Sequence, residues 1–178
     1  MNKLFIILLS YSFVLAQSFD REIDEPTVNS DYSSTTLSKE LSSIVSISTL
    51  AGSGVSGSDD GTGTAASFGY IEGVSIDSKG NIFVAGVGNH LIRKITPEGV
   101  VTTFAGSGSA GSDDGTGTAA SFYRPGYMAI DSLDNIYLTD TGNNLIRKIT
   151  SEGVVTTFAG SGTAGSDDGT GIAASFNN

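Results

Sequence analysis

The 178-residue chain contains no cysteine. Disulfide bonds and paired-cysteine metal sites are therefore excluded, and stability must come from apolar burial and strand pairing. His90 is the single histidine, so a metal site made of several histidines is also excluded within this sequence. The chain lacks a Gly-x-Ser-x-Gly motif and a Walker phosphate loop as well. The commonest sequence signatures of hydrolases and nucleotide-binding proteins are thus missing.

Basic residues are scarce: nine lysines and arginines stand against 19 aspartates and glutamates, for a formal net charge of −10. This charge repels a nucleic-acid backbone and an anionic membrane surface, so we expect no nucleic-acid partner. Long apolar runs are also missing. The run over residues 4–16 is shorter than the ~20 residues that cross a bilayer as a helix, and we expect no membrane span.

Residues 1–16 have the pattern of a cleaved secretory signal peptide. Lys3 precedes the apolar run, and Val14 and Ala16 occupy the two positions that signal peptidase inspects. We therefore predict a secreted, extracellular protein, with an uncleaved signal anchor as the alternative. Residues 17–43 are acidic and rich in Ser and Thr without a sustained period, which predicts a flexible spacer.

The remainder of the chain is repetitive. Asp-Asp-Gly begins at Asp59, Asp113 and Asp167, at equal intervals of 54 residues, each time within the longer pattern AGSGxxGSDDGTGxAASF. A repeat of this length is a supersecondary unit that buries its apolar faces only against its neighbours.

Within one unit, short β-branched and aromatic runs alternate with turn residues. Residues 126–131 and 135–139 predict a hairpin whose loop residue Asp134 takes the left-handed backbone that Gly80 takes one repeat earlier. Residues 145–150 predict a third strand, and residues 100–105 a fourth strand after a Thr-Pro-Glu-Gly turn. Four antiparallel strands repeated in tandem are typical of the blades of a β-propeller, an all-β fold.

The segments VAGVGNHLIRKI (84–95) and LTDTGNNLIRKI (138–149) resemble the NHL repeat, in which a hydrophobic residue precedes roughly Ala-Asp-Thr-x-Asn-His-x-Ile-Arg-x-Ile. The resemblance extends over residues 44–178, which we predict to be NHL-type propeller blades. Each unit departs from the pattern, since Gly86 replaces the aspartate that unit two keeps as Asp140, and Asn144 replaces the histidine that unit one keeps as His90. These residues are therefore expected to shape turns.

The resemblance implies a ring of about six blades, whereas the sequence holds about two. Residues 45–50 correspond to the fourth strand of a preceding blade, and the partner strands of that blade are missing from the repeat region. A fragment of a longer protein is the favoured explanation. Self-assembly of several chains into one ring and a stable open pair of blades are the alternatives.

The adjacent acids of the three loops are weak calcium candidates: Asp59, Asp60, Asp113, Asp114, Asp167 and Asp168. Calcium loops of the helix-loop-helix type place acids at alternate positions and close with Glu, whereas these acids are adjacent. The favoured interpretation is a solvated loop whose acids cap turns, with no metal or other cofactor. The basic pairs Arg93-Lys94 and Arg147-Lys148 are expected to serve structure, with aliphatic stems that cover neighbouring strands and charged ends that bond acids such as Asp131 or Asp140.

Together these observations predict a secreted NHL-repeat propeller that binds a protein or small-molecule ligand and has no catalytic residues of its own. Some secreted proteins similar to this family are lyases or lactonases, so a fragment of a propeller enzyme with its active centre in other blades is one alternative. A calcium-stabilised structural or adhesive protein is the other. Fold alone does not identify the ligand.

Overall fold

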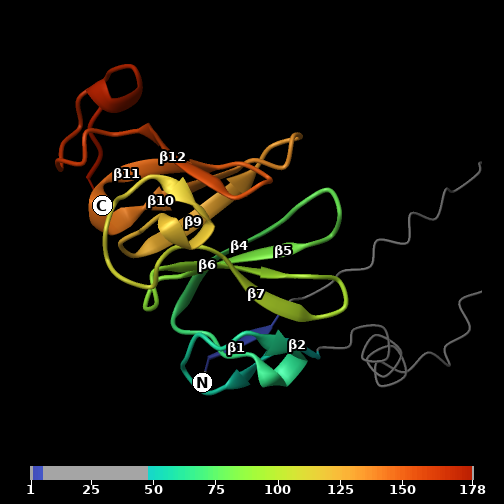
Figure 1. Cartoon of the computed structure of the whole chain (residues 1–178). Coiled ribbons are helices and arrows are strands. Elements are labelled where there is room, and N and C mark those ends of the chain that lie inside the picture. Colours follow the sequence, from blue (N-terminus) through green and yellow to red (C-terminus); the bar gives the residue numbers. More distant parts are fainter. Residues whose placement is uncertain (1, 6–47, 178) are drawn as a thin grey trace, which may run out of the picture. The chain divides into compact units, whose positions relative to one another are not determined.

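The computed structural model describes residues 2–5 and 48–177 (Figure 1). The predicted spacer, residues 17–43, and most of the predicted signal peptide lie outside the described residues. The repeat region forms two antiparallel sheets, as the sequence predicts. No helix in the described part of the chain is long and apolar enough to cross a membrane.

Each 54-residue repeat forms one blade, with strands in the order of the sequence. Blade one consists of β4 (Ile71–Ile76), β5 (Ile82–Gly86), β6 (Leu91–Ile95) and β7 (Val100–Ala105). Blade two consists of β9 (Pro125–Ile130), β10 (Ile136–Asp140), β11 (Leu145–Ile149) and β12 (Val154–Ala159). Every pair of neighbouring strands is antiparallel. The predicted four-stranded propeller blades are confirmed, and the described residues form no closed ring.

The turns have the geometry expected from their residues. Asp134 has a φ of 61° and Gly80 a φ of 82°, so both take the left-handed backbone that the first hairpin loop requires. The turn before the fourth strand is closed by the amide of Gly99, which donates to the carbonyl of Thr96 at 2.8 Å. The residues of these turns therefore favour the observed pairing of the strands that the turns connect.

The long connections contain more structure than the sequence suggests. Each adds a two-residue fifth strand to the outer edge of a sheet, β3 (Gly61–Thr62) on β7 and β8 (Gly115–Thr116) on β12. A 3-10 turn follows each of these strands, η1 (Gly63–Ala65) and η2 (Gly117–Ala119), and a third, η4 (Gly171–Ala173), recurs in the last copy. Each of these two connections thus packs against the blade that follows it in the sequence.

The strand before blade one differs from the expectation. It is β2 (Thr49–Gly54), which begins later than the expected residues 45–50, of which 45–47 lie outside the described residues. Within the repeat region β2 pairs with no other described strand; its partner is β1 (Asn2–Phe5), which lies in the predicted signal peptide. An edge strand presents unpaired backbone groups that accept another strand.

The core lies between the two blades. Phe83, Ala85 and Ile92 of blade one pack against a set of buried residues from blade two and the connection between the blades. This set comprises Ala120, Phe122, Ile136, Leu138, Ile149 and Val155. Figure 1 shows the β4–β7 sheet and the β9–β12 sheet as neighbours, in agreement with these contacts. Face-to-face packing of sheets is what a propeller requires.

The innermost strands approach each other closely where β4 meets β9. A Cβ at Gly73 would lie 2.4 Å from the carbonyl oxygen of Gly126, so only glycine fits there. The signature glycine of the first strand therefore sets the spacing between blades.

Candidate functional site

The first acid of each Asp-Asp-Gly loop bonds a serine eight residues later. In the first loop the hydroxyl of Ser67 donates to Oδ2 of Asp59 at 2.9 Å, and the amide of Asp59 donates back to that hydroxyl at 2.9 Å. The same pair of bonds joins Asp113 to Ser121 and Asp167 to Ser175. These carboxylates close their own loops, in agreement with the turn-capping role expected for them.

The second acid binds a buried arginine on the third strand. Nη2 of Arg93 lies 2.7 Å from Oδ1 of Asp60, and Nη2 of Arg147 lies 2.8 Å from Oδ1 of Asp114. Both arginine side chains are almost completely buried, whereas the two carboxylates remain about half exposed. Each ion pair thus links the loop to the sheet. The carboxylate is in contact with solvent, and the guanidinium is buried.

Backbone carbonyls and an aromatic ring complete each arginine site. In blade two, Nη1 of Arg147 donates to the carbonyl of Ser121 at 3.1 Å and Nη2 to that of Asp113 at 3.0 Å. The guanidinium carbon of Arg147 lies 5.4 Å from the centre of the Phe122 ring. Arg93 repeats these contacts with the first loop and Phe68. The planar, many-donor guanidinium suits such a site better than the point charge of lysine.

Blade two has one additional buried group, Asp140. Its Oδ2 lies 2.9 Å from Nη1 of Arg147, and its carboxylate also accepts bonds from the side chain of Asn143 and the amide of Tyr123. Burial raises the pKa of Asp140, and the donors from Asn143, Tyr123 and Arg147 oppose that rise. Blade one has Gly86 at this position, so Arg93 has no such partner.

The sequence-based prediction for the arginines is correct for Asp140 and wrong for Asp131. The carboxylate of Asp131 accepts bonds from Leu133 and Asn135 and thereby closes the hairpin loop. The pKa of Asp131 is lowered, mainly by the hydrogen bonds from the side chain and the amide of Asn135. Asp60 and Asp114 were missed as arginine partners because they precede Arg93 and Arg147 by 33 residues, too far for a local pattern. The shared 54-residue spacing of both groups was the available signal.

The third loop is different. Asp167 bonds Ser175 as in the other loops, but Asp168 has no arginine partner among the described residues. Phe176, which corresponds to the buried Phe68 and Phe122, is 37% exposed. Within residues 48–177 the third loop thus contacts no following blade of the kind that its two equivalents contact.

His90 lies in a turn, as expected. It has a φ of 56°, and Asn144 has a φ of 54° at the equivalent position of blade two. Nδ1 of His90 accepts a bond from the amide of Arg124 at 3.2 Å, and its ring packs edge-on against Tyr123 at 5.5 Å. The described residues contain no group of three or more His, Cys, Asp or Glu side chains that could hold a metal ion. Calcium binding at the Asp-Asp-Gly loops remains a prediction.

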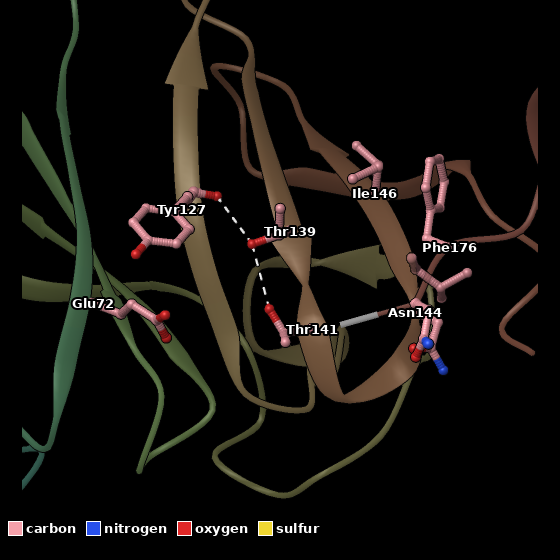
Figure 2. A pocket seen from close by; sticks show the side chains of 9 residues that line it. Glu72, Tyr127, Thr139, Thr141, Asn144, Ile146 and Phe176 are labelled. Carbon is pink, nitrogen blue, oxygen red and sulfur yellow. Dashed lines mark hydrogen bonds between the residues drawn. The ribbon is translucent and has the colours of Figure 1, made fainter. Parts of the chain in front are cut away.

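A cavity of about 410 Å³ lies on blade two, beside the inner strands (Figure 2). Its lining comprises Glu72, Tyr127, Thr139, Thr141, Asn144, Leu145, Ile146, Phe176 and Asn177. The hydroxyls of Thr139 and Thr141 lie 3.5 Å apart at one end, and Figure 2 shows the side chains of Glu72 and Tyr127 on the same side. Hydroxyls, amides, one carboxylate and aromatic rings thus surround an apolar floor.

Gly126 makes this polar end possible. A Cβ there would lie 3.0 Å from Oγ1 of Thr139, 3.3 Å from Oγ1 of Thr141 and 3.5 Å from a carboxylate oxygen of Glu72. Sequence reasoning missed this site because Glu72 comes from blade one and the hydroxyls from blade two, and no local pattern joins them. The only available signal was that Thr139 and Thr141 replace Ala85 and Val87 of unit one.

Comparisons with known proteins agree with the fold. No protein-family model matches the sequence. NHL repeat-containing protein 2 of Gallus gallus is 38% identical over 96 residues, which are 53% of this chain and 13% of that protein. Protein SUPPRESSOR OF QUENCHING 1, chloroplastic, of Arabidopsis thaliana is 35% identical over 94 residues, 52% of this chain and 9% of that protein. The chain therefore spans about a tenth of the length of these relatives.

Among solved structures, a protein of unknown function from Bacteroides thetaiotaomicron is 27% identical with a TM-score of 0.60, over 75% of this chain and 33% of that chain. The repeated motif, the tandem four-stranded sheets and the sequence relatives lead to one assignment. Over about half of its length this chain is similar to NHL repeat-containing proteins, and its two blades are of the propeller type.

Proposed function

We propose that this protein is an exported propeller scaffold that binds a protein or small-molecule ligand at the blade-two cavity and performs no catalysis of its own. The observation that carries the proposal is the division of polar groups. Asp60, Asp114, Arg93 and Arg147 are used in structural bonds, whereas the carboxylate of Glu72 and the hydroxyl of Tyr127 in the cavity lining form no hydrogen bond within the described part of the chain.

The lining indicates the chemistry of the ligand. Glu72 is the only charged residue of the cavity lining, so an anionic ligand is disfavoured and a neutral or cationic one is favoured. Tyr127 is 68% exposed and offers a ring for stacking or for contact with a cation. The hydroxyls of Thr139 and Thr141 add hydrogen-bonding groups beside it. A few polar groups around an apolar floor are typical of ligand pockets.

The cavity can be tested by titration of neutral sugars, amines and short cationic peptides into the isotope-labelled protein. We expect chemical-shift changes at the methyl groups of Thr139, Thr141 and Ile146. Glu72→Gln and Tyr127→Ala should weaken that binding, while Leu133→Ala, on an exposed hairpin loop away from the cavity, should not. Shift changes that survive both cavity variants would place the site elsewhere, and conversion of a bound compound to product would refute the non-catalytic scaffold.

The export component of the proposal rests on residues 1–16 and has its own test. Expression of the whole chain in a secreting host should release protein whose first residue is Gln17. Retention of the protein inside the cell with Met1 intact would refute export without affecting the cavity.

A further inference from the structure

The segment that leads into blade two is held from both sides at two successive residues. On the side of blade two, Oδ1 of the buried Asp140 accepts a hydrogen bond from the amide of Tyr123 at 2.7 Å. The amide of Gly142, also in blade two, donates to the carbonyl of Tyr123 at 2.8 Å. On the side of blade one, Nδ1 of His90 accepts a bond from the amide of Arg124 at 3.2 Å. Tyr123 is thus bonded to blade two, and the amide of the next residue is bonded to blade one.

Arg124 has a backbone conformation that needs such support. Its φ is 56°, in the left-handed region that residues other than glycine rarely adopt. The next residue is Pro125, and a residue before proline favours an extended backbone. Tyr70, the equivalent of Arg124 in unit one, has no positive φ. A conformation of this kind persists only where the surrounding contacts hold it, and the bond to His90 is one of these contacts.

The bond between Arg124 and His90 depends on the protonation state of the imidazole. A neutral imidazole accepts at one nitrogen and donates at the other, whereas an imidazolium donates at both. Protonation of Nδ1 would therefore bring two donors, the ring N–H and the Arg124 amide, against each other. The ring of Tyr123 lies 5.5 Å away and the loop at Gly106 approaches the carbonyl of His90. Within the described residues no carboxylate forms an ion pair with His90, and Arg124 carries a charge of the same sign as the imidazolium.

We propose that His90 is a pH-dependent switch at the junction of the two blades: its neutral ring holds Arg124 in the left-handed conformation, and its protonated ring releases it. Histidine is the side-chain type whose charge ordinarily changes between about pH 8 and pH 5, and His90 is the single histidine of the chain. The bond between Asp140 and the Tyr123 amide does not involve His90, so the segment stays bonded to blade two when Arg124 is released. His90, Tyr123 and Arg124 do not line the cavity, and the switch is independent of the proposed ligand site.

Asp140 is the other titrating group that bonds this segment. Burial raises the pKa of its carboxyl, and the surrounding hydrogen-bond donors oppose that rise. Its bond goes to the Tyr123 amide, whereas the bond of His90 goes to the Arg124 amide. The two amides therefore report the protonation of the two groups separately.

Blade two supplies the residue for a matched control variant. Asn144 occupies the position of His90 with nearly the same φ, 54° against 56°. Asparagine tolerates this backbone, its side-chain oxygen accepts hydrogen bonds, and it does not titrate. His90→Asn therefore keeps an acceptor at this position and removes the group that binds the proton.

The test is NMR spectroscopy of the isotope-labelled full chain, without added histidines, between about pH 8 and pH 5. At the upper pH we expect a scalar coupling across the hydrogen bond, between the Arg124 amide nitrogen and Nδ1 of His90. We also expect the strong intraresidue contact between the amide proton and Hα of Arg124 that marks a positive φ. Both signals should be lost with the same midpoint as the titration of the His90 ring. The amide signal of Tyr123 should not follow that midpoint.

In His90→Asn the Arg124 signal of a positive φ should be the same at both ends of the pH range. A pH-dependent change of that signal in the variant would assign the effect to Asp140 or another group and overturn the proposal. Absence of the coupling in wild type at the upper pH also overturns it, as does a protonated His90 ring beside an Arg124 that keeps its positive φ. Circular dichroism verifies that the variant is folded. The wild-type spectra decide the proposal by themselves if it is not.

Discussion

Replacement of Arg147 by methionine should destabilise the protein more than the same replacement of Arg93. Methionine keeps most of the aliphatic length and removes the charge. In blade two this leaves the completely buried Asp140 without its ion partner, a loss on the order of 3–5 kcal/mol. In blade one the acid that loses its partner is Asp60, which is half exposed and is rehydrated. The loss of stability of Arg93→Met then comes mainly from loop carbonyls that lose their hydrogen-bond donor, and it is about 1–3 kcal/mol.

Blade one also supplies the matched control. Gly86 stands where blade two has Asp140, so the double variant Arg147→Met, Asp140→Gly reproduces the polar groups of the Arg93→Met blade. We expect the double variant to regain most of the difference between the two single variants. The measurement is the free energy of unfolding from urea titration, followed by tyrosine fluorescence and circular dichroism. Coincident transitions of both signals would justify a two-state treatment.

The pH dependence gives a second readout of the same variant. Burial already raises the pKa of Asp140, and removal of Arg147 should raise it further. A group with a raised pKa in the folded state favours folding when it is protonated, so its contribution is lost as pH rises. The deficit of Arg147→Met should therefore shrink as pH falls from 7 toward 4. Equal losses for both arginines at every pH would refute the assignment of Asp140 as the dominant buried partner.

Two further predictions concern carboxylates. The amide and hydroxyl of Ser78 in blade one donate to Asp134 of blade two at 2.9 and 2.7 Å, and these bonds lower the pKa of Asp134. Its stabilisation should be present above pH ~4 and lost as pH falls through that lowered value, so acid unfolding of Asp134→Asn should depend less on pH. For calcium, we expect the melting temperature to be the same with and without millimolar ion, because Asp60 and Asp114 already bind arginines. If calcium raised the melting temperature of the wild type but not that of Asp59→Asn, the result would support a calcium site in the loop.

The blades could be predicted from local sequence because their determinants are local. Asp134 and Gly80 adopt the left-handed backbone that their turns require, and Gly99 closes the turn before the fourth strand. The fifth short strand at Gly61–Thr62 could not be predicted, since two residues carry no periodicity. The cavity also escaped prediction, because Glu72 and Thr141 belong to different blades.

The sequence by itself determined the period, the turns and the resemblance to NHL repeats, since each of these depends on residues close together in one repeat. Only the tertiary structure decided what the Asp-Asp-Gly acids do. Asp114 and Arg147 are 33 residues apart and are in contact because the connection before blade two packs against that blade. The tertiary structure also showed that the face of Phe158 is exposed while that of Phe104 packs against the core. The two repeats are closely similar but have different surroundings, so burial depends on the neighbour as well as on the repeat itself.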